Sequence, residues 1–242
     1  SYGWVIATPE AILVEGHDVV TGHPLQSFRC EAVGRLAALL FLHHIISYHD
    51  IHPRGTLQTF LDNTGVISVE SQFLQHYTIF PTLAGSGDSD VLLALKRVHH
   101  AIPMLITTQH VKGHQDRNLP VANLPWSAQL NVHADKIATE WLDQIEQGWS
   151  TPTYPISEGL IHLYHEHTLV SSQHTHTLRY AVAESDMREY LCERFGWTSD
   201  TYFEVDWLSY ARARNKAHSA MSLFTTKLLV GWLPTKSRLH KY

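Results

Sequence analysis

Residues 88–111 read DSDVLLALKRVHHAIPMLITTQHV, and this stretch decides the fold class. Its first part, up to Ile102, predicts a helix capped by Ser89 or Asp88, and the remainder predicts a strand. The preceding segment GTLQTFLDNTG, at 55–65, indicates another strand that ends in turn-forming residues. Because a strand, a helix and a strand follow one another here, we expect an α/β domain with a partly parallel sheet.

The flanking segments extend this alternation. Residues 2–20, YGWVIATPEAILVEGHDVV, alternate apolar and polar side chains around a proline and a glycine. This predicts two antiparallel strands and leaves a third open. Residues 27–46 place apolar side chains at helical spacing and predict a buried helix with Ser27 as its N-cap. An apolar stripe over 131–147 predicts the last helix of a mixed sheet flanked by helices.

The α/β pattern ends near Gly148, so we assign residues 1–148 to one domain. Residues 149–160 have the Gly, Ser, Thr and Pro content of a linker. The stretch that follows alternates like a hairpin, and helical segments then continue to Pro234. We expect residues 161–242 to form a smaller, mostly helical unit that begins with a β-hairpin.

The composition narrows the class of protein. With 242 residues and 44% hydrophobic content, the chain has enough apolar side chains for a packed core. It lacks the pattern of a signal peptide and the run of about eighteen apolar residues typical of a membrane span. Its two cysteines, Cys30 and Cys192, suit a reducing compartment, cytoplasmic or nuclear. The net charge of -5 argues against nucleic-acid binding by bulk electrostatics, although residues 201–242 carry seven bases against two acids.

Three acidic side chains stand where a sheet and two helices bring groups together. Asp62 directly follows a predicted strand, at the end where open α/β sheets present their ligands. Glu31 lies in the first turns of the first helix and Asp135 in the first turn of the last one, both off the apolar stripes. Three such carboxylates cannot all stay ionised without a cation, and oxygen ligands suit Mg²⁺ or Mn²⁺. Two such ions would serve in-line displacement at a phosphodiester.

Each acid also has a structural explanation. Asp62 precedes Asn63, Thr64 and Gly65, which are turn-forming residues. Asp135 in a first helical turn would complement the helix macrodipole, and acids are common at the place that Glu31 occupies. Taken singly, none of the three is identified as a ligand.

In combination, these residues resemble the ribonuclease H domain of retrotransposon-type reverse transcriptases. The resemblance covers roughly residues 1–148 and rests on the motifs YGWVIA, SFRCEAVGRLAAL, FLDNTG, VKGHQD and NVHADKIA. It implies a ribonuclease H-like fold in which Glu31, Asp62 and Asp135 are catalytic and bind two Mg²⁺ or Mn²⁺ ions. It also implies that His114 shuttles a proton during hydrolysis or helps the product to leave.

The resemblance implies a substrate and a partner as well. Enzymes of this family hydrolyse the RNA strand of RNA–DNA hybrids, which they select by shape and by contacts to 2′-hydroxyl groups. We expect Asn63, Gln115 and Asn131 to contact hydroxyls or phosphates, with turn and capping roles as the alternative. A reverse transcriptase domain in the same polyprotein is the expected partner, and no membrane is expected.

One metal ligand of the family has no counterpart in this sequence. It is an Asp in an Asp-Gly-Ser turn upstream of the YGWVIA pattern, whereas this sequence starts at Ser1. Asp18 falls in the next strand or turn and does not suit that role. Because losing such a charge weakens transition-state stabilisation, we expect the parent protein to be active and this chain to be weak or inactive. The alternative is a non-catalytic ribonuclease H-like module that binds nucleic acid or scaffolds the reverse transcriptase.

The chain contains 19 histidines, several of them in the expected hairpin. In strands, His165 and His167 would share one face and His174 and His176 another, so that four imidazoles could hold a zinc ion. Zinc sites usually recruit cysteine, and exposed histidines are common without metal, so the sequence favours the ordinary explanation.

Overall fold

The structure is a computed structural model that describes residues 1–75, 85–146, 156–159, 161–165, 167–216, 221 and 223–224. The chain divides into two compact units, Ser1–Leu178 and Arg179–Tyr242. Strands and helices alternate in the first unit, so the expected mixed α/β class is confirmed.

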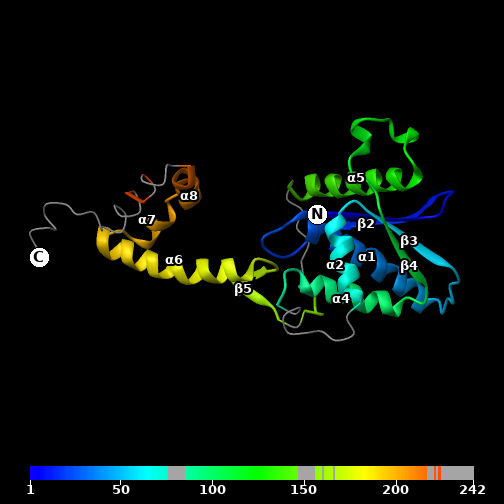
Figure 1. The fold of residues 1–242 in the computed structure, drawn as a ribbon, viewed down its shortest axis with the longest axis horizontal. Helices are drawn as coiled ribbons and strands as arrows, with labels where there is room; N and C mark the ends of the chain where they lie inside the picture. Colours follow the sequence, from blue (N-terminus) through cyan, green and yellow to red (C-terminus); the bar gives the residue numbers. More distant parts are fainter. Residues whose placement is uncertain are drawn as a thin grey trace, which may run out of the picture. The chain divides into compact units, whose positions relative to one another are not determined.

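The described elements are labelled in Figure 1. The strands are β1 (Tyr2–Ala7), β2 (Ile12–Asp18), β3 (Thr56–Leu61), β4 (Leu105–His110), β5 (Leu163–His165) and β6 (Thr168–Val170). The α-helices are α1 (Ser27–Tyr48), α2 (Thr64–Gln75), α4 (Ser89–Ala101), α5 (Trp126–Glu146), α6 (His174–Phe195), α7 (Ser199–Phe203) and α8 (Trp207–Lys216). Two short 3-10 turns, η1 (Gln115–Arg117) and η2 (Val121–Asn123), lie between β4 and α5.

The strands pair two by two. β1 and β2 are antiparallel, whereas β3 and β4 are parallel, in a register that sets Leu61 opposite His110. α2 and α4 lie between the two parallel strands in the chain. The described strands form three separate two-stranded sheets, so the single mixed sheet expected from the sequence is not formed among them, although one pair is parallel. After Asp18, the described residues up to α1 form no third strand, and only His23 makes a bridge, to Val170 of β6.

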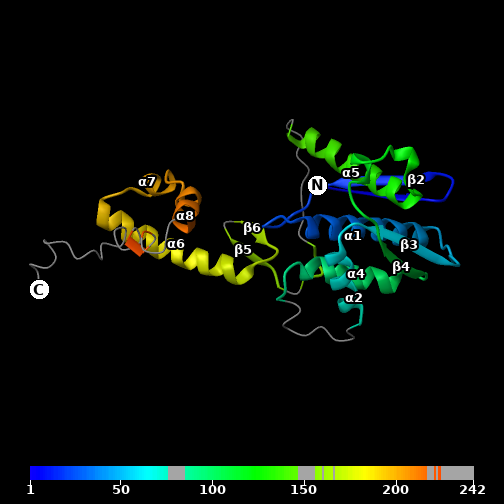
Figure 2. The same ribbon diagram turned by 45° about the horizontal axis from the view of Figure 1, so that its top comes forward.

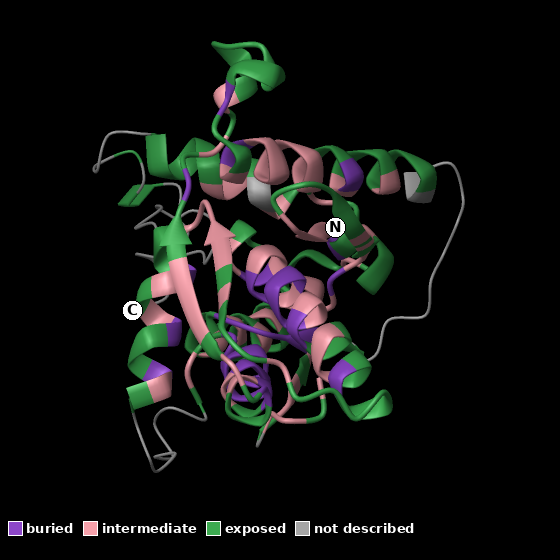
Figure 3. Cartoon of the chain, turned by 90° about the vertical axis from the view of Figure 1, so that its right-hand side faces the viewer, coloured by how far each residue is buried: buried purple, intermediate pink, exposed green. Residues whose placement is uncertain are grey.

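The core lies between α1, α4 and the parallel strands, where Figure 3 shows the buried segments. Leu36 and Leu39 of α1 pack with Val91 and Leu95 of α4, and partly buried apolar residues of β3 and β4 close the cluster. α5 packs on β1 instead. Gly3 makes this contact possible, because a Cβ at that position would collide with a backbone carbonyl of α5.

α1 is the central helix of this unit. It is long and apolar enough to cross a membrane by length and composition alone, a test that the core helix of a soluble protein also passes. It begins at Ser27 with Gln26 as the N-cap, so the predicted cap was one residue late. It also carries two buried arginines, Arg29 and Arg35, which both pair with acids of the same unit.

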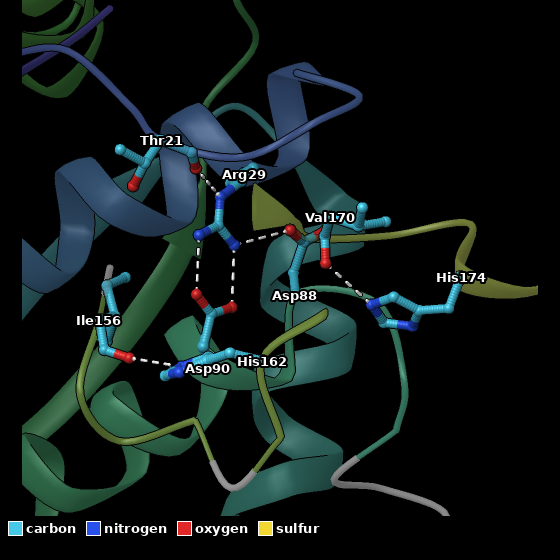
Figure 4. A network of polar contacts seen from close by, with 8 residues as sticks. All are labelled: Thr21, Arg29, Asp88, Asp90, Ile156, His162, Val170 and His174. Carbon is cyan, nitrogen blue, oxygen red and sulfur yellow. Dashed lines mark hydrogen bonds and ion pairs between the residues drawn. The ribbon is translucent and has the colours of Figure 1, made fainter. Parts of the chain in front are cut away.

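Arg29 joins three parts of the first unit (Figure 4). Its guanidinium donates to Asp88 at 3.0 Å and to both oxygens of Asp90 at 2.9 and 2.7 Å, and its Nε donates to the Thr21 carbonyl. Asp88 is the N-cap of α4, but its carboxylate binds Arg29 and makes no cap bond. The Asp88 N–H donates to the Ser171 carbonyl at 2.7 Å. These bonds hold the starts of α1 and α4 and the β5–β6 hairpin together.

The β5–β6 hairpin therefore belongs to the first unit, and the division falls after Leu178. Backbone hydrogen bonds attach the hairpin to His23, so it does not open a separate unit over 161–242 as the sequence predicts. Within the predicted linker 149–160, the structure describes only 156–159, and the other positions lie outside the described residues.

The second unit is helical throughout its described residues, as predicted for the C-terminal part. Leu191 of α6 and Tyr202 of α7 are buried, and the Tyr202 ring lies 4.9 Å from the Trp207 ring of α8. Thr198 caps α7 by accepting a hydrogen bond from the Thr201 N–H at 3.1 Å. The predicted helical segment up to Pro234 lies mostly outside the described residues.

Arg35 joins α1 to the parallel strands and to α2. Its Nε lies 2.9 Å from a Glu70 oxygen, and its two terminal nitrogens donate to Thr59 of β3 at 2.7 Å and to Thr108 of β4 at 2.8 Å. The Arg35 and Glu70 side chains are only 3% and 4% exposed. Such a buried charge keeps its ionised form only while its partner is present.

Replacing Arg35 by Met should destabilise the first unit by roughly 3–5 kcal/mol, because Glu70 would stay buried without its partner. The double variant Arg35→Met, Glu70→Leu should recover most of this loss, since it removes both charges. Urea unfolding followed by fluorescence measures the two differences. Equal losses in the single and the double variant would contradict this account of the pair.

Candidate metal and nuclease site

Asp62 lies at the carboxyl end of β3, as predicted. The parallel partner strand continues beside it, because the Val111 N–H donates to the Leu61 carbonyl at 2.9 Å. His110 Nε2 lies 3.1 Å from the Asp62 carbonyl oxygen. The next loop passes directly over the carboxylate, since a Cβ added to Gly113 would lie 2.6 Å from Asp62 Oδ2. Glycine is therefore required at this position.

Glu31 faces Asp62 from the second turn of α1. Its Oε1 accepts a hydrogen bond from Asn63 Nδ2 at 3.2 Å, while its Oε2 is buried without a partner. Burial raises the pKa of Glu31 to about 8, and the neighbouring Asp62 carboxylate adds to the shift. At neutral pH the Glu31 carboxyl group therefore keeps its proton.

Asp135 completes the group from α5. Burial raises its pKa, repulsion from Asp62 adds to the shift, and His114 opposes it. The Nδ1 of His114 lies 3.9 Å from Asp135 Oδ2, and both side chains are about half exposed. The structure thus places the side chains of the three predicted acids, Glu31, Asp62 and Asp135, close to one another and to the predicted His114.

Asp135 does not lie in the first turn of its helix, contrary to the prediction. α5 begins at Trp126, because the Pro125 carbonyl already accepts hydrogen bonds from the Ala128 and Gln129 N–H groups at 2.9 and 3.0 Å. A residue this far inside the helix gains little from the macrodipole, which acts within the first turn. That alternative explanation for Asp135 is therefore removed.

The turn predicted after Asp62 is the start of a helix. Asn63 Oδ1 accepts from the Gly65 and Val66 N–H groups at 2.9 and 3.3 Å and so caps α2. The same side chain donates to Glu31 through Nδ2. Asn63 is thus a positioning residue for the acid, a role that the sequence analysis did not find.

The other predicted contact residues differ in their surroundings. Gln115 Nε2 donates to the Lys112 carbonyl at 2.8 Å and closes the loop that carries His114. His114 has φ 53°, so this loop turns sharply at the histidine. Asn131 Nδ2 is buried without a partner, and Asn131 precedes Asp135 by four residues, so both lie on one face of α5. Contacts from these residues to hydroxyls or phosphates remain predictions.

The donor set fits a hard divalent cation. It consists of carboxylate oxygens, one of them buried and unpartnered, which is the type of ligand that Mg²⁺ and Mn²⁺ prefer. Within the described part of the chain, however, no three His, Cys, Asp or Glu side chains are arranged to hold a metal ion.

The four-histidine zinc site expected in the hairpin does not form. His165 ends β5 and His167 occupies the turn with φ 66°, whereas His174 and His176 lie at the start of α6. The positive φ of Gln173 marks the turn into that helix. Two strand pairs of histidines therefore cannot face one another.

No known protein family, curated protein or solved structure matches the chain. The geometry of the site must therefore carry the functional argument.

Glu31→Gln should change the pH dependence of stability. The pKa of Glu31 rises from 4.5 to about 8 on folding, so the folded state binds the proton more tightly and wild-type stability falls as pH rises through this range. The melting temperature of the Gln variant should be close to that of wild type at about pH 5 and above it at about pH 9. Thermal unfolding over this range measures the difference.

Glu140→Gln is the matched control, because this acid is exposed on α5 and takes no part in the group. Its melting-temperature difference from wild type should stay constant with pH. A constant difference for Glu31→Gln as well would show that folding does not raise the pKa of Glu31.

Proposed function

We propose that the chain carries the site of a metal-dependent endonuclease that hydrolyses the RNA strand of RNA–DNA hybrids. The observation that supports this proposal is the convergence of three acids: Glu31, whose Oε2 is buried without a partner, faces Asp62 at the end of β3, and Asp135 lies beside them on α5. Carboxylates are held this close at a cost in stability, and clusters of perturbed pKa values mark functional sites. By its resemblance to retroelement reverse transcriptases, the domain would belong to a polyprotein with a reverse transcriptase domain as its partner.

Glu31, Asp62 and Asp135 would hold two Mg²⁺ or Mn²⁺ ions. When bound, these ions stabilise the charge that develops on a phosphodiester during in-line displacement. Asn63 keeps Glu31 turned toward Asp62, and Gly113 leaves room for the loop to pass over the Asp62 carboxylate.

His114 is the proton carrier in this proposal. It is exposed on a sharply turned loop, and its Nδ1 lies 3.9 Å from Asp135 Oδ2. An imidazolium at this position can donate a proton to a leaving oxygen. Because imidazole gains and loses a proton near neutral pH, the His114 side chain can then take up a proton again from water.

A non-catalytic role is the second candidate, and one observation favours it. No three ligands among the described residues are arranged for a metal, and Glu31 with a pKa of about 8 is mostly neutral at pH 7. A module of this kind would bind nucleic acid or scaffold the reverse transcriptase without cleaving its ligand.

Cleavage of an end-labelled RNA–DNA hybrid in Mg²⁺ and in Mn²⁺ separates the two candidates. We expect weak metal-dependent cleavage that Asp62→Asn abolishes, because the neutral amide cannot replace the carboxylate as a ligand. Asp143→Asn, an exposed acid of α5, should cleave like wild type. Binding without cleavage would favour the non-catalytic module, and cleavage that survives Asp62→Asn would contradict the proposed site.

His114→Ala should slow cleavage roughly a hundredfold with little change in the affinity for the hybrid, since general acid catalysis contributes about this much. Single-turnover rates as a function of pH measure the effect. The variant should also lose the part of the pH profile that depends on imidazole, and an unchanged profile would exclude the proposed proton transfer.

A further inference from the structure

A hollow with a volume of about 320 Å³ opens beside α5, on another side of this helix from Asp135. Ile12 at the start of β2 and Val121 of η2 form one side, and residues of α5 form the rest. Figure 2 shows α5 lying beside β2 in this part of the first unit. The hollow takes no part in the chemistry proposed above.

Its walls are apolar and open to solvent. Trp126 is 39% exposed, Ile12 is 39% exposed and Val121 is 42% exposed, although all three line a concave surface. An indole ring at the edge of such a hollow offers a flat face of the kind on which a planar heterocycle stacks.

The polar groups of the hollow lie on α5. The Gln129 side-chain N–H donates a hydrogen bond to the Leu124 carbonyl at 2.8 Å, which fixes the orientation of the amide group. His133 Nε2 lies 2.7 Å from Glu15 Oε2, which fixes the imidazole. The Lys136 ammonium is 67% exposed, and its contact with Glu140 at 3.6 Å is of the exposed type that contributes little. The hollow thus combines apolar walls, oriented polar edges and a cation.

We propose that this hollow binds one unpaired nucleotide of a strand that continues beyond the hybrid. The flat face of a nucleobase can stack against the apolar walls, and its polar edge can form hydrogen bonds with Gln129 and His133. The phosphate of the same nucleotide can pair with the Lys136 ammonium. A duplex keeps its bases stacked inside, so only an unpaired nucleotide can enter.

This inference rests on the proposed function, because it adds a subsite to the same substrate. α5 carries both places: Trp126 and Asp135 are nine residues apart, which is about 14 Å along the helix axis and about two and a half turns, so they project from opposite sides of the helix. The axial length corresponds to about four nucleotides of a stacked strand. A single strand that leaves the hybrid near the carboxylates must therefore also pass around α5 to enter the hollow.

Fluorescence anisotropy with labelled nucleic acids tests the proposal, with Ca²⁺ in place of Mg²⁺. The probes are a blunt RNA–DNA hybrid, the same hybrid with a short single-stranded extension, and the single-stranded oligonucleotide alone. The extension should tighten binding by wild type about tenfold, as one stacked base does.

Trp126→Ala should remove this gain and leave the affinity for the blunt hybrid unchanged. Lys136→Glu, at an exposed position that tolerates substitution, should also reduce the gain and guards against a folding defect in the first variant. Leu142→Ala is the matched control, because Leu142 is exposed on α5 outside the hollow, and it should keep the gain.

The proposal is overturned if the extension adds no affinity, or if the gain survives both Trp126→Ala and Lys136→Glu. Cleavage of the blunt hybrid together with either result would leave the nuclease function standing without the subsite. Trp126-dependent binding of the single strand without any hybrid cleavage would support the subsite and count against the nuclease.

Discussion

The buried guanidinium of Arg35 is the interaction on which the site depends. It binds Thr59 of β3, Thr108 of β4 and Glu70 of α2 from a single side chain of α1. Arg35 follows Glu31 by four residues, so both project from one face of the helix. The contacts that fix the rotation of α1 over the parallel strands therefore also direct Glu31 toward the end of β3, where Asp62 stands.

The site itself opposes folding. Glu31 and Asp135, whose pKa values are raised by burial and by the neighbouring Asp62, lower stability at neutral and alkaline pH because their negative charges are held in a partly buried place. The core of α1 and α4 and the arginine contacts offset this cost. A chain under no functional constraint would gain stability by losing one of these acids, which is why their proximity favours a ligand-binding role.

Local patterns were enough to predict the strand, helix and strand around 88–111 and the place of Asp62, since both follow from periodicity and strand order. The start of α5 was not predicted because it depends on hydrogen bonds to a single carbonyl, that of Pro125. α2 was not predicted because its cap depends on the side chain of one residue, Asn63. The division between units was misplaced for a different reason. The hairpin is attached through Asp88, held in turn by Arg29, and such long-range buried ion pairs leave no periodic signal in a sequence.

The central claim is that Glu31, Asp62 and Asp135 form one cation site. Titration with Mn²⁺, followed by electron paramagnetic resonance of the free ion, tests this without requiring catalysis. The account predicts saturable binding by wild type that strengthens as pH rises, because the Glu31 proton must leave. Asp62→Asn and Asp135→Asn should each lose this binding. Binding that is absent in wild type, or that persists unchanged in both variants, would contradict it.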